Sequence, residues 1–349
     1  MKHNFGAGPC ILPQEVFKDA AAAVLDFNGL SILEVSHRSA DFVKVMEEAR
    51  ENVKKALNVP EGYTVLFLQG GASLGFLISA YNFAGKNKKA GYVNTGTWST
   101  KAVKEGKNAG LEVIEIASSE DKGFNYIPEL NDIPEDLDFI HYTSNNTIAG
   151  TQFKSIPETN IPLICDMSSD IFSQPIDVSK FDLIYAGAQK NLGPAGSTLY
   201  IVKDSVLGKS TLDIPTYLDL QVHAKKDSMF NTPPVFSVYV ANLNLKYMIK
   251  NGGVDAIAKR NEEKAELLYN EIDNNPNFEG TTEVKDRSLM NVTFRLTDDS
   301  KKERFDQLWN DGNIVGLKGH RSVGGYRASM YNALEIESVK ALVEIMKAL

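Results

Sequence analysis

Between residue 63 and about residue 202, short apolar runs alternate with amphipathic or small-residue segments. The runs are rich in Val, Ile, Phe and Tyr and are bounded by Gly, Asn or Asp, a pattern typical of buried strands. Strands are expected at 63–68, 91–94, 111–116, 137–143, 161–165, 181–186 and 197–202, and helices at 73–83 and 101–108. The alternation predicts an α/β fold with a large, mostly parallel sheet covered by helices.

Helical patterns flank this region on both sides. A helix is expected over 14–26, and Ser39 is suited to cap a second helix whose apolar positions follow a helical period. The Asn-Gly-Gly sequence at 251–253 should end one helix and start another. A strand over 288–295, a helix over 302–309 and a terminal helix from Glu335 then form a separate α+β pattern. The expected parts are an N-terminal arm that packs on the small domain (1–13), a large domain (14–252) and a small C-terminal domain (253–349).

Composition narrows the class of protein. A chain of 349 residues with 43% apolar content can bury a large core and should form more than one domain. A net charge of −8 argues against a nucleic-acid or anionic membrane partner. The two cysteines form neither a disulfide framework nor a metal-ligand pattern, and neither a signal peptide nor a long apolar run is apparent. We therefore expect a cytoplasmic protein without a metal site.

One lysine has an unusual setting. Lys190 lies in a Gly-rich bend between two predicted strands, after Gly187 and before Gly193 and Gly196. The small residues allow a ligand to approach closely, and a lysine at such a place can serve as a nucleophilic amine. An ordinary solvated hairpin loop has the same composition, so this segment alone leaves both interpretations open.

Two further features suit a phosphorylated, aromatic cofactor. Gly70 and Gly71 join a predicted strand to a predicted helix, and the free N–H groups of such a junction can bind phosphate. Asp166 ends a predicted strand 24 residues before Lys190, where its charge could keep a ring nitrogen protonated. A tight turn and a turn-capping aspartate are the structural alternatives.

The remaining candidates are an aromatic residue and two basic clusters. Trp98 follows a predicted strand and could stack on a cofactor, although a tryptophan in the core is the commoner outcome. Arginines suit the forked binding of carboxylate or phosphate, although scattered surface arginines are ordinary. The basic residues in question are His37, Arg38, His320, Arg321 and Arg327. Together these features are what a pyridoxal phosphate enzyme needs to act on an anionic amino acid.

The sequence resembles the phosphoserine aminotransferases, class V members of the fold-type I pyridoxal phosphate enzymes. The resemblance runs from end to end, and it is carried by the order and combination of several motifs. They are NFGAGPCILP, SHRS, QGGAS, NTGTWS, HYTSNNTIAG, CDMSSDIFSQPIDV, YAGAQKNLGPAG, NTPPVFSVY and GHRSVGGYRASMYNA. The family's reaction converts O-phospho-L-serine and 2-oxoglutarate to 3-phosphohydroxypyruvate and L-glutamate, in serine biosynthesis. It is a ping-pong reaction in which the cofactor alternates between its pyridoxal and pyridoxamine forms.

The resemblance implies roles for individual residues. Lys190 would carry pyridoxal 5′-phosphate as a Schiff base and transfer the substrate proton, and Asp166 would pair with the ring nitrogen. Trp98 would stack on the ring and Thr147 would hydrogen-bond its phenolic oxygen. The cofactor phosphate would be held by Ala72, Ser73, Ser168 and Gln189, joined by Asn231 and Thr232 of the partner subunit. The resemblance thus implies a homodimer with shared sites.

The resemblance also implies how the substrate is bound. Arg327 would hold the α-carboxylate, and His37, Arg38, His320 and Arg321 would take the substrate phosphate or the distal carboxylate of glutamate. Ser73 departs from many members of the family, which carry Arg or another residue there, so the grip on the cofactor phosphate should depend more on backbone N–H groups.

Three alternatives stay open at this point. Another class V transaminase, of the alanine:glyoxylate type, would share Lys190 and Asp166 but would not need the His-Arg clusters. A cysteine desulfurase would need a mobile catalytic cysteine, which neither Cys10 nor Cys165 is placed to be. A non-catalytic protein that binds a phosphometabolite could use the same cradle. The resemblance further implies 4-phosphohydroxythreonine, the substrate of the family's vitamin B6 branch, as a second substrate.

Overall fold

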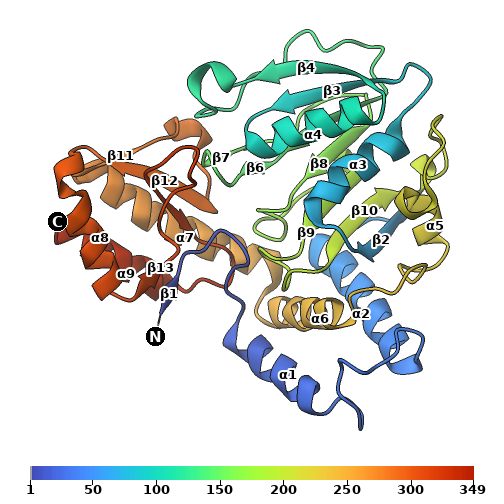
Figure 1. Cartoon of the computed structure of the whole chain (residues 1–349), viewed down its shortest axis with the longest axis horizontal. Coiled ribbons are helices and arrows are strands. Elements are labelled where there is room, and N and C mark those ends of the chain that lie inside the picture. The colour runs from blue at the N-terminus through green and yellow to red at the C-terminus, as the bar shows by residue number, and fades with distance from the viewer. Residues whose placement is uncertain (1) are drawn as a thin grey trace.

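A seven-stranded sheet forms the centre of the larger lobe in the computed structural model, which describes residues 2–349 (Figure 1). The strand order is β2-β10-β9-β8-β5-β3-β4, and only β10 is paired antiparallel to its neighbours. The strands are Tyr63–Leu68 (β2), Lys89–Asn94 (β3), Glu112–Ser118 (β4), Phe139–Thr143 (β5), Leu163–Asp166 (β8), Leu183–Gly187 (β9) and Thr198–Lys203 (β10). The predicted α/β fold with a mostly parallel sheet is confirmed, with small shifts at the strand ends.

Helices cover both faces of this sheet. One face packs against Ala40–Leu57 (α2) and Val235–Lys250 (α6), and Gln14–Leu25 (α1) lies along α6. The other face packs against Gly71–Phe83 (α3) and Thr97–Asn108 (α4). Ser39 caps α2 as predicted, by accepting a hydrogen bond from the N–H of Phe42. Helix α4 begins earlier than the expected residue 101, so that Trp98 lies in its first turn.

The C-terminal lobe combines a three-stranded antiparallel sheet with three helices (Figure 1). Its elements are Gly253–Asn274 (α7), Phe278–Gly280 (β11), Asn291–Leu296 (β12), Lys302–Asp311 (α8), Ile314–Val315 (β13), Tyr326–Ser329 (β14) and Ile336–Lys347 (α9). Near the N-terminus, His3–Asn4 (β1) pairs in parallel with β13. Val254 and Ile257 pack in the core of the larger lobe, whereas Leu268 and Ile272 pack in the C-terminal lobe. Helix α7 therefore belongs to both cores and joins the lobes.

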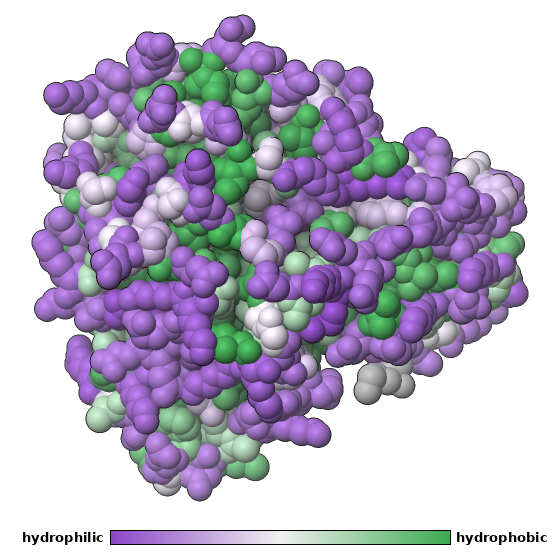
Figure 2. Space-filling model, turned by 180° about the vertical axis from the view of Figure 1, so that it is seen from behind, coloured by the Kyte–Doolittle hydropathy of each residue, from purple (hydrophilic) through white to green (hydrophobic). Residues whose placement is uncertain are grey.

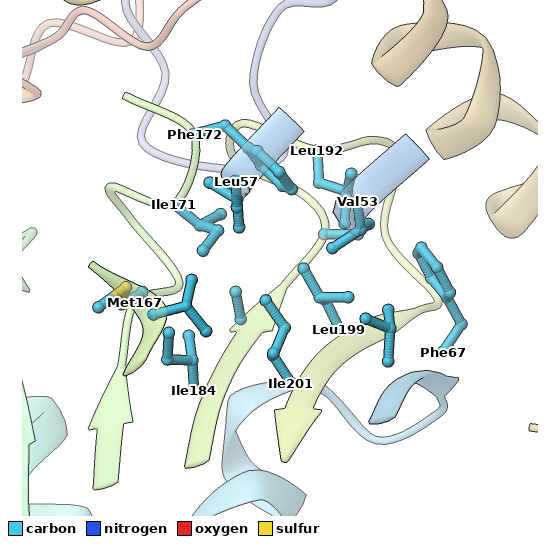
Figure 3. Close-up of a cluster of buried hydrophobic side chains, with 14 of the residues drawn as sticks. Val53, Leu57, Phe67, Met167, Ile171, Phe172, Ile184, Leu192, Leu199 and Ile201 are labelled. Carbon is cyan, nitrogen blue, oxygen red and sulfur yellow. The ribbon is translucent and has the colours of Figure 1, made fainter. Parts of the chain in front are cut away.

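The core beneath the Lys190 bend is tightly filled (Figure 3). Val53 and Leu57 of α2 face Ile184 of β9 and Leu199 of β10 across this cluster. Leu192, two residues after Lys190, is fully buried in the same cluster. Because packed interiors resist displacement, the cluster fixes the backbone that carries the lysine.

A short hairpin between β5 and β8 was not predicted. It consists of Asn145–Asn146 (β6) and Thr151–Gln152 (β7), and all four residues are buried. Polar residues in a segment this short produce no recognisable hydrophobic period.

Most side chains on the outer surface are hydrophilic. Figure 2 shows this from behind, with the C-terminal lobe projecting to the right. Across residues 2–349, no helix has both the length and the apolar character needed to span a membrane.

Candidate active site

The carboxyl ends of parallel strands meet around Lys190. The lysine follows β9, and its Nζ donates a hydrogen bond of 2.9 Å to Thr147 Oγ1, in the β6–β7 hairpin. The same Nζ lies 5.9 Å from the centre of the Trp98 ring. Asp166 is the last residue of β8, which pairs with β9. The crevice at the carboxyl ends of strands is where open α/β sheets bind their ligands.

The environment of Lys190 favours a neutral amine. Removal from water lowers the pKa of Lys190 from 10.5 to about 8, because burial disfavours the charged form. The negative charge of Asp166 opposes this change, while the Arg327 guanidinium adds to it. Roughly a tenth of the amine is therefore unprotonated at pH 7 and can act as a nucleophile or a base.

Asp166 is held in place by its own turn. Its Oδ1 accepts hydrogen bonds from the N–H of Ser168 at 2.9 Å and from the Ser168 hydroxyl at 2.5 Å. The Ser168 hydroxyl in turn accepts a bond from the N–H of Gly187. Burial raises the pKa of Asp166, and the two bonds from Ser168 oppose that rise. Both bonds end on Oδ1, so Oδ2 is the oxygen that can accept a hydrogen bond from a cationic ring nitrogen.

The start of α3 forms an anion cradle. The helix follows Gly70, whose φ is 95°, and begins at Gly71, whose φ is 63°. A Cβ at Gly70 would lie 2.4 Å from Leu74 Cδ2, so only glycine fits there. Among residues 2–349, no side chain caps this helix, which leaves the first-turn N–H groups, including those of Ala72 and Ser73, open to an anion.

Arg327 reaches the site from β14 of the C-terminal lobe. Its Nη1 donates a 3.2 Å hydrogen bond to the carbonyl oxygen of Thr147. Within residues 2–349, its Nε and the Trp98 Nε1 are both buried without a hydrogen-bond partner. A half-buried guanidinium with a buried, unused Nε donor beside the Lys190 amine is suited to bind a carboxylate.

Most of the other residues predicted from the sequence lie away from Lys190 in space within one subunit. His37 and Thr232 line one surface cavity of about 500 Å³, and His320 and Arg321 line another of about 510 Å³ on the C-terminal lobe. Arg38 and Asn231 are exposed. Gln189 lies next to Lys190, and its carbonyl oxygen accepts a 3.0 Å bond from the N–H of Cys10 in the N-terminal arm. The structure therefore brings together Lys190, Asp166, Thr147, Trp98, Ser168, Gln189 and Arg327, but not the two His-Arg clusters.

A second buried carboxylate was missed by the sequence analysis. Asp170 accepts hydrogen bonds from Ser144 Oγ at 2.5 Å and Gln152 Nε2 at 3.3 Å. Burial raises its pKa to about 6, and the neighbouring Asp166 charge acts in the same direction. The repeat of Asp at 166 and 170 in CDMSSD was the available signal, although it does not reveal that both side chains are buried.

The pKa of Lys190 leads to a testable pH dependence. When apoprotein is mixed with pyridoxal phosphate, the initial rate of covalent attachment should rise with pH and level off above about 8. The rate is measured from the visible absorption of the attached cofactor. In Arg327→Gln the plateau should begin at higher pH, because a charge that lowers the lysine pKa is gone. A rate that climbs steadily to pH 10 in the unmodified protein would contradict this environment.

Comparison with known proteins agrees with this architecture. The family model described as "Aminotransferase class-V" matches residues 3–342. The chain is 58% identical to phosphoserine aminotransferase of Flavobacterium psychrophilum, with 100% of this chain and 98% of the relative covered. The fold and the family model together define a class-V aminotransferase.

Two solved structures narrow the class further. Phosphoserine aminotransferase from Bacillus circulans subsp. alkalophilus superposes with a TM-score of 0.96 at 43% identity, covering 100% of this chain and 98% of that one. The pyridoxal phosphate-bound enzyme from Trichomonas vaginalis superposes with a TM-score of 0.94 at 37% identity, covering 99% and 100%. The chain belongs to the phosphoserine aminotransferase family, and the resemblance seen in the sequence is confirmed.

Proposed function

We propose that this protein transfers the amino group of O-phospho-L-serine to 2-oxoglutarate, giving 3-phosphohydroxypyruvate and L-glutamate with pyridoxal 5′-phosphate as cofactor. The observation that carries the proposal is the setting of Lys190, whose amine bonds to Thr147 and lies in the field of Asp166 and Arg327. The identity of 58% to a phosphoserine aminotransferase supports the choice of substrate.

The residues around Lys190 fit this cofactor. The uncapped start of α3 suits a phosphate, the Trp98 ring suits an aromatic ring, and the open oxygen of Asp166 suits a ring nitrogen. Thr147 would bond the phenolic oxygen. The phosphate would be held by Ala72, Ser73, Ser168 and Gln189, and by Asn231 and Thr232 of the partner subunit. When bound, pyridoxal phosphate supplies a carbonyl that takes up the amino group and a ring that withdraws electrons from the α-carbon.

The protein's own groups then bind, orient and move a proton. Arg327 holds the α-carboxylate through its free donors, which aligns the α-carbon with Lys190 Nζ. The lysine acts as the base that removes the α-proton, since its lowered pKa makes a neutral amine available. Asp166 would supply a negative charge to the ring nitrogen. Thr147 contacts both residues, because its hydroxyl accepts a hydrogen bond from Lys190 and its carbonyl oxygen accepts one from Arg327.

The substrate phosphate requires a second group of basic residues. We assign this role to His37 and Arg38, together with His320 and Arg321 contributed across a homodimer. In one chain His37 lines one surface cavity, whereas His320 and Arg321 line another, and a two-fold assembly is the ordinary way to place one subunit's residues at the other's site. We further propose that the large domain spans 14–252 and the small domain 253–349, with the arm at 1–13 packing on the small domain.

A steady-state comparison tests the proposed substrate. Purified holoenzyme is assayed with phosphoserine plus 2-oxoglutarate and, separately, with alanine plus glyoxylate. We expect kcat/KM to favour phosphoserine by roughly a thousandfold or more, because a site built for a charged group rejects a substrate that lacks it. A preference for alanine and glyoxylate would instead support the other type of class V transaminase. The same assay with 4-phosphohydroxythreonine decides whether that compound is a second substrate.

A further inference from the structure

A buried pair of amides crosses the boundary between the two lobes. Asn145 of β6 donates from Nδ2 to Oδ1 of Asn291 in β12, at 2.8 Å. The exposed fractions of the two side chains are 1% and 0%. A hydrogen bond this far from water forms only if both amides keep their positions, because any displacement leaves a buried polar group unpaired.

Each amide is also bonded within its own lobe. On the large-lobe side, Asn145 Nδ2 donates to Ser169 Oγ, and the Ser169 hydroxyl donates back to the Asn145 carbonyl, each at 2.8 Å. On the other side, Asn291 Nδ2 donates to Ser329 Oγ at 2.9 Å and to Tyr331 Oη at 3.3 Å. The Tyr331 hydroxyl then donates to the carbonyl of Ala7 in the N-terminal arm. One polar network thus connects the turn after Asp166, the C-terminal lobe and the arm.

The pair lies next to the two residues that contact Lys190 and the expected carboxylate. Asn145 precedes Thr147 in the same hairpin, and Thr147 bonds both Lys190 and Arg327. In the β12–β14 register, Asn291 is opposite Ser329 and Thr293 is opposite Arg327. The Asn145–Asn291 and Thr147–Arg327 hydrogen bonds are therefore neighbours, and both join the large lobe to the C-terminal lobe.

We propose that Asn145 and Asn291 are positioning residues that hold Arg327 at a fixed place relative to Lys190, so that substrate carboxylates bind in one orientation. The reason is that Arg327 itself is weakly fixed. Among residues 2–349, the one hydrogen bond of its guanidinium is the 3.2 Å contact to the Thr147 carbonyl, and its Nε is left for a ligand. Neighbouring groups must therefore supply the rigidity that a preorganised site needs.

The inference rests on the proposed function, since it assumes that Arg327 binds a carboxylate. It is tested with the dimeric holoenzyme of Asn291→Ala and with glutarate, a dicarboxylate without an amino or keto group. Calorimetry should show glutarate bound about tenfold more weakly, a change of about 1.4 kcal/mol. The KM for 2-oxoglutarate should rise by a similar factor with kcat changed less than threefold, and the visible absorption maximum of the bound cofactor should be unchanged.

Asn82 supplies a matched control. Its side chain also has three hydrogen-bond partners, namely the carbonyls of Ile78 and Leu218 and the N–H of Leu220, but all lie in the large lobe. Asn82→Ala should lower the melting temperature while leaving glutarate affinity within twofold of the unmodified protein. An Asn291→Ala enzyme that binds glutarate normally, or a loss of equal size in Asn82→Ala, would overturn the positioning role.

A milder variant keeps the test decisive if Asn291→Ala does not fold. Ser329→Ala removes one hydrogen-bond acceptor of Asn291 and should weaken glutarate binding by about threefold. Unchanged glutarate affinity would overturn the inference. Glutarate binding does not require phosphoserine to be a substrate. An unmodified enzyme that fails to transaminate phosphoserine, yet loses glutarate affinity on Asn291→Ala, would refute the proposed function and leave this inference standing.

Discussion

Lys190→Ala is expected to lower transamination of phosphoserine by about 10⁶-fold, a loss typical of removing the central group of a catalytic unit. Under the proposed mechanism, the variant would lose both the amine that attaches the cofactor and the base that takes the α-proton. The side chain is half-buried above a filled core, and Leu192 continues to anchor the bend, so the fold should be retained. Initial rates with phosphoserine and 2-oxoglutarate measure the loss, and circular dichroism checks the fold.

Lys203 provides the matched control for this substitution. It is the last residue of β10 and forms an ion pair with Asp182 at 3.4 Å, with its own side chain 41% exposed. Lys203→Ala should keep normal turnover, since surface ion pairs contribute little. Substantial turnover in Lys190→Ala would remove the lysine from the reaction.

The second large effect concerns the substrate phosphate. Arg38→Ala and Arg321→Ala should each lower kcat/KM for phosphoserine by about a hundredfold, which is the loss expected from removing a strong charge-assisted hydrogen bond. The kcat/KM for alanine should change little. Arg295 is the control, because it lines the same cavity as Arg321 but already pairs with Glu279 at 2.6 Å. Equal losses with phosphoserine and alanine would contradict a role in phosphate binding.

Mixed dimers determine which subunit supplies Arg321. A Lys190→Ala subunit paired with an Arg321→Ala subunit retains one intact site if Arg321 acts across the interface. Mixing the two inactive variants under exchange conditions should then restore activity. If the mixture remains as inactive as its components while subunit exchange is demonstrated, Arg321 acts within its own subunit and the shared site is wrong.

The parts of the fold predicted from sequence are those with strong local patterns. Apolar runs such as 63–68 and 197–202 identify buried strands on their own, and Gly residues mark the bend around Lys190. Asp166 was expected at a strand end, and it is the last residue of β8. Its place near Lys190 was expected from the spacing of 24 residues, which is the length of one strand and its connection.

The features not predicted depend on contacts between distant residues. Asn145 and Asn291 are 146 positions apart, and nothing near either one indicates that their amides meet. Burial of Asp170 likewise arises from its position behind Ser144, not from a local pattern. The pKa of Lys190 also required the structure, because it reflects desolvation balanced against Asp166 and Arg327. Polar networks of this kind leave little trace in hydrophobic periodicity.

The most direct test of the central claim is one half-reaction with a single substrate. Holoenzyme is mixed with phosphoserine in the absence of any keto acid, and the visible absorption of the cofactor is followed by stopped flow. Conversion of the cofactor should be rapid and complete, with release of one equivalent of 3-phosphohydroxypyruvate per Lys190. No spectral change, or no keto acid released at saturating phosphoserine, would contradict the assignment.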